Sequence, residues 1–198
     1  MFKRICKITF ITHGATVYSL NGIINDRVKA PRLNDIGEEE LDKVCEYLEA
    51  RGVAYDNIYT CPYTCCLESA QIIAKLFKQK PRTLDFLNRN HGVWNGVAGA
   101  DLIKELGDDF ISGTPENGES VSDFNKRVSS LIDKLIKENK GNRIIMVVTP
   151  EIVQAALAKT LKVSSKYQHR FLIKTGSLTQ ISYFEGWSSI IYSDYKPI

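Results

Sequence analysis

The chain has 198 residues, 43% of them hydrophobic, and a formal net charge of +3. This size and composition predict one compact domain over residues 1–198. The longest apolar run is shorter than 18 residues, so we expect no transmembrane helix, and the charged N-terminal run is unlike a signal peptide. The small, dispersed charge argues against nucleic acid as a partner. We therefore expect a cytoplasmic protein with no membrane association.

The first predicted strand covers residues 5–11 and ends at Thr12, His13 and Gly14. Ligands of open α/β sheets bind beyond the carboxyl ends of the strands, and Gly14 allows a tight turn. His13 is therefore placed where a reactive imidazole could meet a ligand. A single histidine at a strand end is more often structural than catalytic, so this motif does not decide the function alone.

Further strands and helices are expected to alternate after a polar loop at 19–34. Strands are predicted at 57–60, 83–87 and 143–149, with two or three more within 169–191. Helices are predicted from residue 38, at 62–77, at 100–106, at 119–140 and from residue 150. The glycine-rich segment 88–115 should form a lid beside the pocket. The pattern predicts a three-layer α/β/α sandwich with a mostly parallel central sheet and an antiparallel edge.

Six short motifs occur in a fixed order along the chain, at residues 12–16, 33–37, 60–70, 87–96, 118–127 and 148–152. The first reads Thr-His-Gly-Ala-Thr, the fourth ends in Gly-Val-Trp-Asn-Gly, and the fifth begins with Gly-Glu-Ser. In this order and spacing, from residue 5 to residue 191, the chain resembles the histidine phosphatase superfamily. These phosphoglycerate mutase-like proteins include a small-phosphatase branch, which the short loops of this chain resemble most. The resemblance implies the phosphoglycerate mutase-like fold.

The resemblance also implies a catalytic set, which this chain matches only in part. In the family a histidine attacks phosphorus, two arginines and a second histidine surround the phosphoryl oxygens, and an acidic residue protonates the leaving group. His13 stands at the nucleophile position. Thr12 and Cys65 stand where the family has its arginines, Arg89 where it has the acid, and Pro150 where it has the second histidine.

These replacements should impair phosphoryl transfer, which depends on positioning and on stabilising charge at the phosphoryl oxygens. Neither a hydroxyl nor a thiol replaces the bidentate guanidinium fork. Losing one preorganised donor costs roughly 10²–10³ in rate. Pro150 and Glu151 form a good helix start after Thr149, but Glu151 should repel an anion. The favoured interpretation is a pseudophosphatase with a binding or regulatory role.

A rebuilt phosphatase site is the main alternative. Arg27, Arg32 and Arg89 could bind an anion, and His91 could replace the missing proton donor. The chain would then hydrolyse phosphomonoesters through phospho-His13, as an α-ribazole phosphatase-like or broad-range enzyme. In the structural interpretation of the same residues, Arg89 pairs with a carboxylate such as that of Glu151, and His91 serves packing or the surface.

The five cysteines offer a third possibility. Their odd number and irregular spacing indicate a reducing compartment and no disulfide framework. Cys6 and Cys45 fit core positions, whereas Cys61, Cys65 and His13 should converge at one rim. There they could form a redox-sensitive thiol, a Cys–His nucleophile pair or a zinc site. Inert cysteines are favoured, so no metal or cofactor is predicted; a phosphorylated small molecule and a protein remain the candidate partners.

Overall fold

The computed structural model describes residues 3–25 and 31–198. Within them, six strands form one sheet in the order β3-β2-β4-β1-β5-β6. The strands are β1 (Arg4–Thr12), β2 (Asn57–Thr60), β3 (Arg82–Thr83), β4 (Arg143–Val148), β5 (Leu178–Phe184) and β6 (Trp187–Tyr195). Strands β3, β2, β4 and β1 are parallel, and β5 and β6 add an antiparallel hairpin at one edge.

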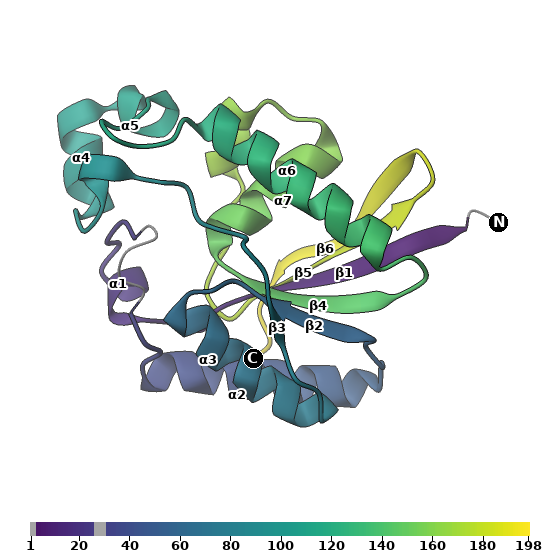
Figure 1. The fold of residues 1–198 in the computed structure, drawn as a ribbon. Coiled ribbons are helices and arrows are strands. Elements are labelled where there is room, and N and C mark those ends of the chain that lie inside the picture. The colour runs from purple at the N-terminus through teal and green to yellow at the C-terminus, as the bar shows by residue number, and fades with distance from the viewer. Residues whose placement is uncertain (1–2, 26–30) are drawn as a thin grey trace.

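Four long helices cover the two faces of the sheet (Figure 1). Helices α2 (Asp35–Arg51) and α3 (Thr64–Phe77) lie on one face, and α6 (Val121–Glu138) and α7 (Pro150–Leu161) lie on the other. The central strand β4 is almost wholly buried, as its β-branched sequence predicts. The structure thus confirms the three-layer α/β/α sandwich.

Three short helices, α1 (Val17–Leu20), α4 (Gly99–Leu106) and α5 (Asp108–Ser112), gather beyond the end of the sheet where the parallel strands finish (Figure 1). The amide of Ile24 donates to Val97 O at 2.9 Å, and the amide of Gly99 donates to Gly22 O at 2.8 Å. These bonds tie the segment after α1 to the segment before α4. Two 3₁₀ helices, η1 (Gly92–Trp94) and η2 (Ser165–Arg170), complete the described elements.

Strands β5 and β6 agree with the two or three strands predicted within 169–191, although β6 continues to residue 195. Two expectations about the elements need correction. The predicted strand at 83–87 is only β3, Arg82–Thr83, because the chain turns at once and the Phe86 amide bonds Leu84 O. The loop predicted at 19–34 begins inside a helix, α1, which Thr16 and Ser19 cap reciprocally. Of the helices described, none combines the length and hydropathy needed to cross a membrane.

The register of the parallel strands brings three loops to one edge. Thr12 pairs with Val148, and Thr60 pairs with Val147. The chain then continues with His13 after β1, with Cys61 after β2 and with Thr149 after β4. The positions expected to carry chemistry are therefore adjacent in space because the strands that precede them end level.

Gly14 allows the backbone after β1 to lie close to the backbone of α2. A Cβ atom on Gly14 would lie 2.2 Å from Gly37 O, and one on Gly37 would lie 2.2 Å from Ala15 O. The turn after β1 therefore packs directly against the first turn of α2, where Asn34 caps the Gly37 amide. This contact explains why the second motif, residues 33–37, ends in glycine, because no larger residue fits there.

Candidate functional site

A cavity of about 200 Å³ lies at this edge of the sheet. Its polar wall comes from the ends of β1 and β4, the first turns of α3 and α7 and the segment before η1: His13, Cys65, Asn88, His91, Thr149 and Glu151. Apolar side chains from the segment after α1 also line it, namely Ile23, Ile24 and Pro31. None of the lining residues that the structure describes is an arginine or a lysine. The described part of the wall therefore offers no cation to a phosphate dianion.

The His13 imidazole is buried, with 8% of its surface exposed, and its orientation is fixed. Nδ1 lies 2.8 Å from Gly14 O. Because a carbonyl oxygen can only accept, Nδ1 carries the hydrogen and Nε2 is left for another partner. That partner is Cys65, whose side chain shares a hydrogen bond with the ring. Burial lowers the pKa of His13, but the Cys65 sulfur and the Gly14 carbonyl together raise it above its ordinary value.

Cys65 stands in the first turn of α3, with 2% of its surface exposed. A hydrogen bond with Cys66 and the neighbouring His13 lower the pKa of the Cys65 thiol well below its ordinary value, against the opposing effect of burial. Burial raises the pKa of Cys66 instead. Cys65 and His13 thus favour a thiolate–imidazolium pair, the arrangement found in reactive cysteines.

Ser69 holds this pair together. Its buried hydroxyl donates to Cys65 O at 2.6 Å and accepts from the Gly14 amide at 3.2 Å. One side chain of α3 therefore joins the backbone beside His13 to the backbone of Cys65. The sequence pattern gave no sign of this role, because Ser69 occupies an ordinary interior position of the helix.

His91 and Glu151 form a second ionisable pair in the cavity wall. His91 Nε2 lies 3.0 Å from Glu151 Oε1 and 3.2 Å from Oε2. His91 Nδ1 is buried and has no hydrogen-bond partner among the described residues.

Pro150 and Thr149 begin α7 as predicted, with Thr149 at the N-cap and Pro150 in the first turn. The Thr149 hydroxyl does not cap the helix; it donates to Asn88 Oδ1 at 2.6 Å. Asn88 thereby connects the start of α7 to the loop before η1, and both residues line the cavity.

A sequence profile of the histidine phosphatase superfamily (branch 1) matches residues 8–192. The chain belongs to this superfamily. A broad-specificity phosphatase of Saccharomyces cerevisiae is 24% identical over 188 residues, covering 91% of this chain and 81% of that protein. A metal-independent phosphoserine phosphatase of Arabidopsis thaliana is 25% identical over 175 residues, covering 82% of this chain and 72% of that protein.

Solved structures support the same fold. A phosphoserine phosphatase of Entamoeba histolytica, in complex with 3-phosphoglyceric acid, superposes with a TM-score of 0.86 at 21% identity, covering 97% of this chain and 98% of that one. An α-ribazole phosphatase of Shigella flexneri gives a TM-score of 0.84 at 17% identity, with 97% and 98% covered. At these identities the likeness establishes the phosphoglycerate mutase-like fold and nothing finer.

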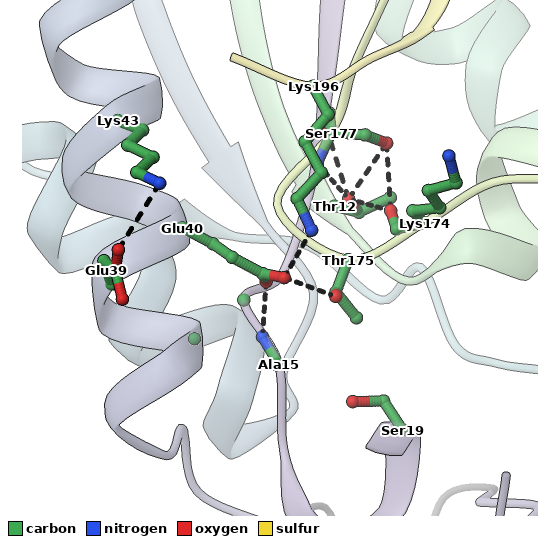
Figure 2. Close-up of polar contacts among 12 residues, drawn as sticks. Thr12, Ala15, Ser19, Glu39, Glu40, Lys43, Lys174, Thr175, Ser177 and Lys196 are labelled. Atoms are coloured by element: carbon green, nitrogen blue, oxygen red, sulfur yellow. Dashed lines mark hydrogen bonds and ion pairs between the residues drawn. The ribbon is translucent and has the colours of Figure 1, made fainter. Parts of the chain in front are cut away.

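Thr12 and Arg89 stand at two positions to which the resemblance assigns a catalytic role. Neither is among the described residues that line the cavity. The Thr12 hydroxyl donates to Lys174 O at 2.7 Å and accepts from the Ser177 amide at 2.9 Å (Figure 2). It fastens the loop before β5 to the end of β1. Arg89 donates to Glu119 O at 2.8 Å and to Gly113 O at 2.7 Å. Its guanidinium therefore braces the loop before α6 through two backbone carbonyls, and it also interacts electrostatically with the carboxylates of Glu151 and Glu119.

Arg32, another candidate anion-binding residue, is not among the described residues that line the cavity. Arg32 pairs with Glu68 at 2.6 Å, and its side chain is 83% exposed. Arg27 lies outside the described residues. Arg127, part of the fifth motif, donates to Glu119 and to Leu87 O, so it holds the segment that carries Asn88.

Glu40 is a site-supporting residue that the sequence did not reveal. Its carboxylate accepts from the Ala15 amide at 2.8 Å, from the Thr175 hydroxyl at 3.2 Å and from the Lys196 ammonium (Figure 2). The run of glutamates at 38–40 was expected to favour a helix N-terminus, but α2 already begins at residue 35. Glu40 consequently faces the turn that carries His13.

The remaining cysteines do not complete a metal site. Cys61 is buried and shares a hydrogen bond with Cys66. In the described part of the chain, no three His, Cys, Asp or Glu side chains are grouped so that they could hold a metal ion. Among the residues that the structure describes, the zinc alternative therefore has no geometric support.

Proposed function

We propose that this superfamily member is a catalytically impaired phosphatase whose cavity serves binding or regulation. The observation that carries the proposal is the engagement of the His13 ring by Cys65 and Gly14. Attack on phosphorus needs a free lone pair on Nε2. In a thiolate–imidazolium pair that lone pair is protonated, so the ring is a poor nucleophile.

The charge of the cavity supports the same proposal. A phosphomonoester needs preorganised cations around its oxygens, and one missing donor costs roughly 10²–10³ in rate. The described wall offers no guanidinium or ammonium group, and the Glu151 carboxylate lies within it. A neutral or weakly charged small ligand suits this wall better than a dianion does.

Turnover of p-nitrophenyl phosphate by the purified chain tests the proposal, with His13→Ala as the matched variant. We expect no release above that of the variant at any pH between 5 and 9. Hydrolysis by the wild-type chain that disappears in His13→Ala would overturn the proposal.

Phosphomonoester hydrolysis is the second candidate, because both curated relatives are phosphatases and His13 is present. It requires cations from outside the described wall. Arg27 is two positions from Asn25, which lines the cavity. If hydrolysis is found, Arg27→Ala should reduce it strongly and Arg32→Ala, on the exposed surface, should not.

A further inference from the structure

Cys65 and His13 form a chemical unit that phosphoryl transfer does not use. Both residues line the cavity, and each is more than nine-tenths buried. Gly14 O holds the His13 ring through Nδ1, so Nε2 is the ring nitrogen left for Cys65. Ser69 fixes the two backbones relative to each other. A nucleophile, a base and a group that orients the base are thus assembled, as covalent catalysis requires.

We propose that Cys65 and His13 act as a nucleophile–base pair that accepts an acyl group from a small, uncharged ester or thioester. The substrate class follows from the wall of the cavity. The described lining offers no cation and includes the Glu151 carboxylate, which disfavours anions. Ile23, Ile24 and Pro31 supply apolar surface, and about 200 Å³ admits only a short acyl group.

The reaction balances with water as its only co-substrate. The Cys65 thiolate attacks the carbonyl carbon, the S–C bond forms, and the bond to the leaving oxygen or sulfur breaks. The leaving group takes the proton from His13 Nε2, which leaves a Cys65 thioester and a neutral ring. Water then attacks the thioester while His13 takes its proton, and the carboxylic acid departs as the Cys65 thiolate and the imidazolium are restored.

The other cysteines provide a contrast within the same chain. Burial raises the pKa of Cys45 on α2 and of Cys6 on β1 to about 11 each. Cys45 is nevertheless the most exposed of the five, since it is half-buried and the others are buried. If exposure governed reactivity, Cys45 would react first; if the histidine partner governs it, Cys65 would.

The experiment is acylation of the full chain by p-nitrophenyl acetate. We expect a burst of nitrophenolate stoichiometric with protein and one acetyl group, located on Cys65 by peptide mass mapping under mildly acidic conditions. Cys65→Ser should abolish the burst, and the matched control Cys45→Ser should retain it. Acetyl groups on Cys45 in preference to Cys65, or an undiminished burst in Cys65→Ser, would overturn the proposal.

The role of His13 is tested separately by pH. In the wild-type chain the acylation rate should stay nearly constant across neutral pH, because the thiolate is already formed. His13→Gln should lower the rate at pH 7 by about 100-fold and make it rise with pH like that of an ordinary thiol. If the acylation rate of His13→Gln depends on pH in the same way as that of the wild type, His13 does not act with Cys65 as a pair. Because p-nitrophenyl phosphate reports on the proposed loss of phosphatase activity and the acetate ester on this thiol, either idea can fail without the other.

Discussion

The side chains of His13, at the end of β1, and Cys65, in the first turn of α3, share a hydrogen bond inside one cavity. The resemblance to the superfamily implies a nucleophile at the first position and an anion-binding arginine at the second. In this chain we infer an imidazolium and a thiolate there, whose opposite charges offset each other.

Ser69→Ala should weaken the link between Gly14 and Cys65. The variant leaves the buried Gly14 amide without its acceptor, so the free energy of unfolding should fall by about 1–3 kcal/mol, measured by urea denaturation. Ser130 is the matched control because its hydroxyl also bonds the carbonyl four residues earlier, but on the exposed surface of α6. Ser130→Ala should change stability by less than about 0.5 kcal/mol. Equal effects of the two variants would contradict the special role of Ser69.

Glu40→Gln should loosen the turn that carries His13. The side chain of Glu40 is 11% exposed, and its charge is matched by Lys196. We expect a loss of about 1–2 kcal/mol by denaturation and a lower pKa of His13 by NMR titration, because the Glu40 charge helps to raise it. Glu39→Gln, which removes only an exposed pair with Lys43, should change neither. A His13 titration unaffected by Glu40→Gln would refute the coupling.

The stability that the Cys65–His13 pair contributes should rise as the pH increases from about 5 toward neutrality. The folded pKa of Cys65 is below the unfolded value of 9.0, so its contribution is present above that value and is lost as pH falls through the folded pKa. The folded pKa of His13 is above 6.5, so its contribution is present below 6.5 and is lost as pH rises through the folded pKa. Between pH 6.5 and the folded pKa of His13, the gain from Cys65 and the loss from His13 offset each other, so the combined contribution rises from about pH 5 to pH 6.5 and then stays level. The free energies of unfolding of wild type and Cys65→Ser, from urea titrations, should diverge as the pH rises from 5 toward neutrality; a pH-independent difference would exclude the ion pair.

Glu151→Gln should improve the affinity of the cavity for inorganic phosphate. Removing one negative charge from the wall changes the binding free energy by about 1 kcal/mol at moderate effective dielectric, or roughly 5-fold in affinity. Isothermal titration calorimetry measures this directly. Glu116→Gln, an exposed charge that does not line the cavity, serves as the control. A comparable gain in the control would show that general charge, and not this wall, governs phosphate binding.

Substitution by the residues that the resemblance implies should strengthen phosphate binding only at positions that line the cavity. Cys65→Arg with Pro150→His places a guanidinium and an imidazole in the wall, and this double variant should bind phosphate more tightly than the wild type does, measured by calorimetry. Thr12→Arg with Arg89→Glu should give no gain in phosphate affinity and should lower stability, because it breaks the buried contacts with Ser177 and Gly113. A gain in phosphate affinity in the second double variant alone would contradict the assignment of the cavity wall.

Much of the fold followed from local pattern. The β-branched run of β4 and the helix start at Thr149, Pro150 and Glu151 are properties of neighbouring residues, so the sequence predicted them. The spaced motifs identified the superfamily, which the profile match to residues 8–192 confirms. Strand β3 was overestimated because an apolar run near a buried loop resembles a strand until its hydrogen-bond partners are known.

By itself the sequence determined the sandwich, the superfamily and the residue types at each motif position, because periodicity and spacing are encoded along the chain. Only the tertiary structure decided which of those residues face one another. It directed Thr12 and Arg89 to backbone carbonyls, paired His13 with Cys65, and brought Glu40 and Ser69 to the same turn. Side-chain direction and partner choice depend on contacts between segments far apart in sequence, and no local pattern records them.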